Sequence, residues 1–178
     1  MQLLERYAVL LKLVRAMNEA DSWSGETHIQ KSVFFLQEAL ATQLGYGFML
    51  YKHGPFSFDL RDDLIAMRAD EFLELRVRHP DYGPSYVPGR RASLLAASAA
   101  TPENLERRIE FVARRIAPRP VAELEVLATA LYTRKEMRGS SDEVLAQRIH
   151  ELKPHVSVSR ASEALTQLRV LMQEAERL

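Results

Sequence analysis

The stretch Tyr51-Lys52-His53-Gly54-Pro55-Phe56-Ser57 decides the fold of this 178-residue chain, because it joins three kinds of local structure. It continues the apolar run 48–51, which has the composition of a short strand. Gly54 permits unusual φ angles and Pro55 fixes its own, so the pair predicts a sharp turn. Ser57 is a suitable N-cap for a helix that follows. The stretch therefore predicts a strand, a turn and a helix start in direct succession.

Helical patterns lie on both sides of this stretch. Apolar residues recur at helical spacing over residues 2–20. A second helix is expected from an N-cap at Ser24 to the glycines at 45 and 47, with Leu40 and Leu44 on its apolar face. A third helix is expected over residues 58–69, with four side chains facing inward: Leu60, Leu64, Ile65 and Met67.

A β-hairpin is expected after the third helix. Apolar and charged residues alternate over 72–78 in the pattern of a half-buried strand, with Leu73, Leu75 and Val77 inward. Residues 79–83 have turn chemistry, and residues 85–87 can form the returning strand. The order helix, helix, strand, helix, hairpin predicts a mainly α fold with a small β-wing, in which residues 1–90 form a winged-helix-like unit.

Residues 91–178 are expected to form a helical extension, packed with the first unit as one globule. Helix starts are predicted at Thr101-Pro102-Glu103, at Val121, at a Ser140 cap and at a Ser159 cap. The first of these helices has one apolar stripe, formed by Leu105, Ile109, Val112 and Ile116. The stretch 90–100 is the expected boundary between the two units.

Composition narrows the function classes. Lys+Arg and Asp+Glu both number 24, so the chain lacks the excess of positive charge that is usual in a dedicated duplex binder. Cysteine is absent, which removes disulfides, thiol nucleophiles and thiolate metal sites. No apolar run is long enough for a membrane span, and the start lacks a signal-peptide pattern. These features predict a cytoplasmic protein without a cofactor or membrane contact.

Three short strings resemble the YwgA-like proteins of bacteria, which are related to the Panacea (SocA-antitoxin-like) domains. They are His28-Ile29-Gln30-Lys31-Ser32-Val33-Phe34-Phe35-Leu36, the stretch 51–57 quoted above, and His150-Glu151-Leu152-Lys153-Pro154-His155. The resemblance implies a winged-helix-like fold with extra helices. It also implies an association with antitoxins, one of which delivers its toxin to a protease. It implies no catalytic residue, and none is assigned.

The candidate partner-binding or turn motif consists of Lys31, Tyr51, His53, Gly54, Pro55, Phe56 and Ser57. The aromatic side chains around the turn, with Trp23 and Phe58, can form either a protein-binding cleft or the core that seats the turn. Lys31 is expected either to be solvated or to reach the carbonyl groups of the turn.

Arginines form two basic clusters that are candidates for nucleic-acid contact: Arg76, Arg78, Arg90 and Arg91 at the wing, and Arg107, Arg108, Arg114 and Arg115 on a later helix. The alternatives are a solvated hairpin and a self-paired helix face. Glu103 and Glu110 stand four residues before two of these arginines, in the favourable ion-pair orientation.

The third helix, which a winged-helix protein normally offers to the DNA major groove, has three aspartates: Asp59, Asp62 and Asp63. Carboxylates near phosphates are repulsive unless a metal intervenes. The sequence therefore favours a non-enzymatic protein-interaction module with an antitoxin, defence or regulatory role. The alternatives are a DNA-binding regulator, and more weakly a metal-dependent enzyme that uses these aspartates with His53 and His28. A homodimer through the last two helices is a further hypothesis.

Overall fold

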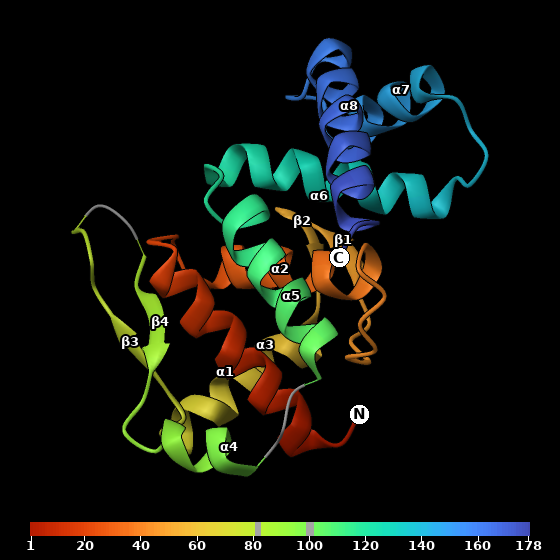
Figure 1. The fold of residues 1–178 in the computed structure, drawn as a ribbon. Helices are drawn as coiled ribbons and strands as arrows, with labels where there is room; N and C mark the ends of the chain where they lie inside the picture. Colours follow the sequence, from red (N-terminus) through yellow and green to blue (C-terminus); the bar gives the residue numbers. More distant parts are fainter. Residues whose placement is uncertain (81–82, 99–101) are drawn as a thin grey trace.

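The computed structural model describes residues 1–80, 83–98 and 102–178, and it is mainly helical with two small antiparallel sheets. The N-terminal unit contains helices α1 (Leu3–Glu19), α2 (Glu26–Glu38) and α3 (Phe58–Ala69). Two hairpins accompany them, β1 (Met49–Tyr51) with β2 (Gly54–Phe56), and β3 (Leu73–Arg76) with β4 (Ser85–Pro88). The predicted mainly α fold with a small β-wing is therefore confirmed, with β3 and β4 as the wing and β2 as a strand that was not predicted (Figure 1).

The stretch that decides the fold is more regular than predicted. Residues 54–56 form a second strand instead of a simple turn, and Tyr51 pairs with Gly54 in a hairpin with a two-residue loop. Gly54 has a φ of +86°, a value that glycine adopts without strain. The Ser57 hydroxyl accepts a hydrogen bond from the Leu60 amide, which confirms Ser57 as the N-cap of α3.

The two strands of the wing differ in burial: β4 is buried or half buried, whereas β3 is exposed after Leu73. Leu73 is buried, but 70% of Val77 is exposed and Leu75 is also exposed, so the prediction of a half-buried strand is wrong after Leu73. The reason is that β4 is the inner strand, which packs on α1 with Ser85 and Tyr86 buried, while β3 lies outside it. The Tyr86 amide donates to the Ser24 carbonyl, and the Ser24 hydroxyl donates to the Tyr86 carbonyl. The predicted turn 79–83 includes residues 81 and 82, which lie outside the described part of the chain.

Several predicted helix boundaries are wrong by a few residues. Because the Ser24 hydroxyl bonds to the wing, the N-cap of α2 is Gly25. Helix α2 ends at Glu38, so Leu40 and Leu44 are buried in an irregular loop instead of on a helix. The exposed Ile65 was expected to face inward on α3. The caps of the two last helices are Ser141 and Ser157, in place of Ser140 and Ser159.

The helical extension consists of α4 (Ala92–Ser98), α5 (Glu103–Phe111), α6 (Val121–Glu136), α7 (Asp142–Leu152) and α8 (Val158–Ala175). Helix α4 occupies the stretch that was expected to be a boundary, and it packs on α1. Pro102 precedes α5, while the predicted cap Thr101 lies outside the described residues. Helix α5 continues into a π-helical turn, η1 (Val112–Ile116), and the apolar stripe is buried from Ile109 onward.

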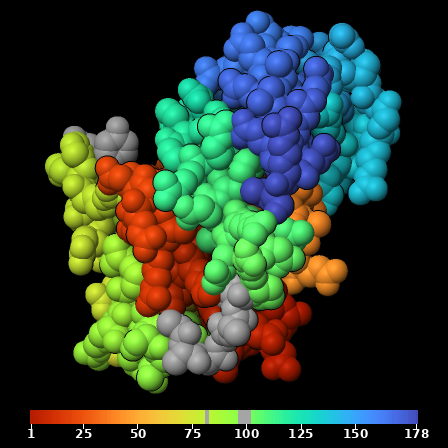
Figure 2. Space-filling model, in the orientation of Figure 1, coloured from red at the N-terminus to blue at the C-terminus, as the bar shows by residue number. Residues whose placement is uncertain are grey.

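One continuous hydrophobic cluster joins the two units. It includes Leu10 and Phe34 from the N-terminal helices, and Leu127, Ile149 and Leu168 from the extension. Figure 2 shows α7 and α8 gathered at one end of the molecule, with the N-terminal helices and the wing at the other. None of the helices in the described residues has the length and apolar character needed to cross a membrane.

Candidate functional site

Lys31 connects α2 to the β1–β2 hairpin. Its side chain is fully buried, and Nζ donates a hydrogen bond to the Pro55 carbonyl at 2.9 Å. Of the two expectations for this lysine, the one in which it reaches the turn carbonyls is therefore confirmed. The hairpin is held to α2 by a charged donor inside the protein, where such a hydrogen bond is stronger than in water.

Gln30 makes a second connection, immediately before Lys31. Its amide nitrogen donates to the Ser57 carbonyl at 2.9 Å, and its amide oxygen accepts from the Ser57 amide at 2.9 Å. Both residues are fully buried. The residue that begins α3 is thus fixed to α2 through both of its backbone polar groups, and its hydroxyl is used in the cap.

Helices α6 and α7 close the other side of the hairpin. A Cβ on Gly54 would lie 3.2 Å from Thr129 Oγ1 and 3.3 Å from the Glu125 carbonyl, so the strand packs closely on α6. His53 Nδ1 is 3.1 Å from a carboxylate oxygen of Glu125. The buried Lys153, which follows α7, donates to the Lys52 carbonyl at 3.0 Å. We call this arrangement the lysine clamp: Lys31, Lys153 and the hairpin loop between them.

The strings 28–36, 51–57 and 150–155 meet at this clamp. Lys31 belongs to the first string, Gly54 and Pro55 to the second, and Lys153 to the third. More than a hundred residues separate the ends of this set in the sequence. Their convergence gives the three strings a common physical role, which is to fix the hairpin in one position.

Burial changes the pKa of both lysines. Burial lowers the pKa of Lys31 to about 8 from its ordinary 10.5, while the charge of Glu125 acts in the opposite direction. Burial also lowers the pKa of Lys153, again against Glu125. Burial of the two amino groups in their charged form therefore opposes folding, and the Glu125 carboxylate partly compensates this cost.

We expect the stability of the protein to increase with pH between about pH 8 and pH 10.5. In this range Lys31 loses its proton in the folded protein but keeps it in the unfolded chain. Rising pH therefore removes the cost of burying a charged amino group, which is fully present below pH 8. From pH 7 to 9.5 this single group should add about 2 kcal/mol to the free energy of unfolding. Urea unfolding of the wild type and of Lys31→Met at the two pH values would measure the difference.

The half-exposed Lys12 offers the matched control, because Lys12→Met removes a lysine that pairs with Glu106 at the surface. This variant should keep the pH dependence of the wild type, whereas Lys31→Met should lose about 2 kcal/mol of it. If the free energy of unfolding changed with pH in the same way in the wild type and in Lys31→Met, the lowered pKa of Lys31 would be contradicted.

Three aromatic rings form an exposed surface on the clamped hairpin. Tyr51, Phe56 and Phe58 have ring centroids 5.1 to 5.8 Å apart. Tyr51 is 56% exposed and Phe58 is 38% exposed, so the expectation that these rings form the core that seats the turn is wrong for both. The buried clamp holds the turn instead. Trp23 is not part of this group and lies under the guanidinium of Arg78. We call Tyr51, Phe56 and Phe58 the hairpin surface.

Carboxylates neutralise most of the arginines that were candidates for nucleic-acid contact. At the wing, Arg78 pairs with Asp21 and Arg90 pairs with Glu71. Arg91 lies over the ring of Phe72, and Arg76 is exposed without an ion-pair partner among the described residues.

On the later helix, the predicted pairs of Arg107 with Glu103 and of Arg114 with Glu110 are confirmed. Arg115 pairs with Glu174 of α8 at 2.6 Å, and Arg108 reaches the Ala41 carbonyl at 3.5 Å. The arginines on this helix face are therefore largely paired with glutamates. This agrees with the interpretation of the cluster as a self-paired helix face and not as a site for nucleic acid.

The three aspartates of α3 do not act as one acidic face. Asp63 pairs with Arg6 at 2.8 Å and accepts from the Tyr46 hydroxyl at 2.7 Å, so it anchors α1 and the loop after α2. Asp62 bonds to the neighbouring Arg61, and Asp59 is exposed. Among the described residues, no three His, Asp or Glu side chains are grouped as a metal site requires.

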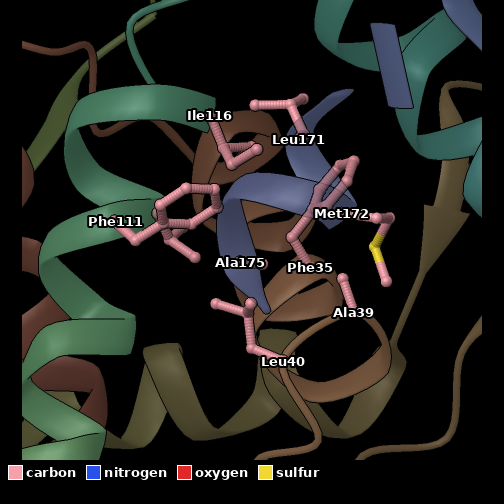
Figure 3. A pocket seen from close by; sticks show the side chains of 9 residues that line it. Phe35, Ala39, Leu40, Phe111, Ile116, Leu171, Met172 and Ala175 are labelled. Carbon is pink, nitrogen blue, oxygen red and sulfur yellow. The ribbon is translucent and has the colours of Figure 1, made fainter. Parts of the chain in front are cut away.

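An apolar pocket between α2, η1 and α8 is too small to serve as a ligand site. It has a volume of about 10 Å³, at the limit for a single water molecule. Figure 3 shows Phe35 and Leu40 of the N-terminal unit facing Phe111, Ile116 and Leu171 across it. The pocket is a packing seam where the two units meet.

Sequence comparison supplies no further assignment. A scan against models of protein families finds no match, and a search of curated proteins finds no similar sequence.

Proposed function

We propose that this protein is a non-enzymatic interaction module of winged-helix type that binds another protein through the hairpin surface. The observation that carries the proposal is the exposure of Tyr51, on a hairpin that buried groups hold in place, beside the exposed Phe58 at the start of α3. Aromatic residues dominate the binding energy of protein interfaces, because they bury a large area and lose little conformational entropy. A rigid hairpin reduces the entropy lost on binding further.

Charge supports a protein partner over nucleic acid. Binding to a duplex depends on arginines and lysines that can neutralise phosphates. Here the net charge is zero, and ion pairs would have to break before Arg78, Arg90 or Arg115 could contact a phosphate. Asp59 and Asp62 also remain on the surface of α3.

The biological setting that we propose is an antitoxin, defence or regulatory system in bacteria. It is supported by the resemblance of the three strings to YwgA-like and Panacea proteins. The product of a neighbouring gene is the first candidate partner.

A photo-crosslinking amino acid at position 51, introduced in the native host, would test the proposal. We expect position 51 to crosslink to one specific protein, because it lies in the exposed ring cluster. Position 170 on α8 is the control, since Val170 is also apolar and half exposed but belongs to the helical extension. No adduct at position 51, or the same adducts at both positions, would contradict the proposal.

The purified partner then allows the contribution of each ring to be measured. Tyr51→Ala and Phe58→Ala should each weaken binding by about tenfold or more, which is the usual effect of removing a central aromatic residue. Val170→Ala should leave the affinity unchanged. Isothermal titration calorimetry would give the three dissociation constants.

A further inference from the structure

A cleft of about 980 Å³ opens beside α3, and nothing in the function proposed above uses it. Its walls come from four parts of the chain: residues 21–28, the outward face of α3, the wing and residues 118–122. Figure 1 shows the end of α1, the wing and the start of α6 on the same side of the molecule. We call this the arginine cleft, after Arg61, Arg68 and Arg119 in its walls.

Apolar side chains in the cleft are open to solvent. Ile65 is 52% exposed, Val121 is 42% exposed and Leu75 is 37% exposed, although each belongs to a different element. Trp23 and Tyr86 add aromatic surface to the same walls. An exposed apolar group of this kind, surrounded by charged residues, is typical of a binding surface.

The charge balance of the cleft is positive. Arg61 is paired with Asp62, and Arg119 is 4.0 Å from a carboxylate oxygen of Glu123, but Arg68 has no ion-pair partner among the described residues. Of the two acidic residues in the walls, Asp21 is paired with Arg78, which leaves Glu26. The walls therefore contain three arginines and two acids, and Arg68 is the arginine that is free to pair with a carboxylate of a ligand.

The arginine cleft is continuous with the hairpin surface. Phe58, Arg61, Ile65 and Arg68 are spaced so that they lie along one face of α3. The Arg61 guanidinium lies over the Phe58 ring, 5.0 Å from its centre. A partner held by the aromatic rings at one end of α3 can thus extend along this face into the cleft.

We propose that the arginine cleft binds an extended acidic segment of the partner protein, in which carboxylates are interspersed with apolar side chains. This inference rests on the proposed function and specifies its partner. The apolar side chains of the segment would cover Ile65, Leu75 and Val121, while its carboxylates would pair with the arginines. A nucleic-acid strand fits less well, because it has no aliphatic side chains to cover Ile65, Leu75 and Val121.

The test uses the full-length protein and defined probes. Fluorescent peptides of twelve residues would combine Glu or Asp with Leu, Ile, Phe or Trp at varied spacing. A matched set would have Lys in place of every acid, and a single-stranded DNA oligonucleotide would be the third probe. Fluorescence anisotropy at constant salt should show binding of members of the acidic set in preference to the lysine set and the oligonucleotide.

Arg68→Glu should weaken binding of the acidic peptides by about tenfold or more, since it replaces an attractive charge with a repulsive one. The matched control is Arg114→Glu, which changes the net charge equally at an exposed residue outside the cleft. Circular dichroism would confirm that both variants are folded. Equal weakening by the two variants, no preference for the acidic set, or tighter binding of the oligonucleotide would overturn the proposal.

The two proposals can fail separately. Crosslinking from position 51 that persists in Arg68→Glu, with no preference for acidic peptides, would leave the hairpin surface as a protein-binding site and remove the cleft. If acidic peptides bind in the cleft but position 51 gives no specific adduct, the cleft would remain as a binding site and the hairpin surface would be removed.

Discussion

Replacing Gln30 with leucine is expected to lower the free energy of unfolding by about 4 kcal/mol. Leucine is similar in size but cannot bond to Ser57, whose amide and carbonyl both depend on the Gln30 side chain. Each buried backbone group left without a partner costs about 1–3 kcal/mol, and here there are two. Water cannot easily replace the amide, because Gln30 and Ser57 are both fully buried. Urea denaturation of the wild type and the variant would measure the loss.

Gln37 provides a matched control on the same helix. It also bonds to both backbone groups of one loop residue, donating to the Tyr46 carbonyl at 2.8 Å and accepting from the Tyr46 amide at 2.9 Å. Tyr46 is itself buried, but Gln37 is half buried and the flanking Gly45 and Gly47 are exposed, so water can reach the groups that Gln37→Leu would release, and the loss should be about 1 kcal/mol. Similar losses in the two variants would contradict the role of burial in this prediction.

Local signals were sufficient for much of the fold. Helix α3 has the bounds expected from its cap and its apolar spacing, and the returning strand of the wing begins at Ser85 as expected. These elements depend on interactions between residues close in sequence, which spacing and capping rules describe well. The same rules failed where a side chain has a distant partner, as Ser24 does in bonding to Tyr86.

The candidate site was predictable only in part. The contact between Lys31 and the turn was one of two alternatives, and its signal was the pairing of two short strings. Lys153 lies in the third string, but no local pattern places it beside Lys52, about a hundred residues earlier. The arginine cleft was missed for the same reason. Its walls come from four separate segments, and the inward-facing assignment of Ile65 concealed an exposed apolar residue.

The acidic character expected of α3 also needs revision. Asp63 is directed at Arg6 and Tyr46, while Arg61, Ile65 and Arg68 line the cleft, and Phe58 lies next to Arg61 on the same face of α3. The helix that a winged-helix protein normally offers to DNA is therefore apolar and basic on one side and acidic on another. This division favours a partner with both apolar and acidic groups over a uniform row of phosphates.

Gly89 lies at the base of the wing. Replacing it with alanine should lower the free energy of unfolding by about 3 kcal/mol, which is the upper end of the range for overpacked sites. A Cβ at this position would lie 2.3 Å from the Glu71 carbonyl oxygen and 3.1 Å from the Leu73 amide nitrogen. These are backbone atoms that cannot rotate away. The Gly89 amide also donates to the Phe72 carbonyl at 2.9 Å, so the strand cannot retreat without losing this bond.

Gly47→Ala is the control for Gly89→Ala, because a Cβ at position 47 would meet no atom within 4 Å. Its free energy of unfolding should stay within about 0.5 kcal/mol of the wild type, or rise slightly as the unfolded chain loses freedom. Urea denaturation of both variants would separate steric overlap from the general effect of removing a glycine.

Because the displaced wing includes Leu75 and Tyr86, Gly89→Ala should also weaken binding of acidic peptides in the cleft. A Gly89→Ala variant as stable as Gly47→Ala would mean that the base of the wing is not packed against Glu71 as described.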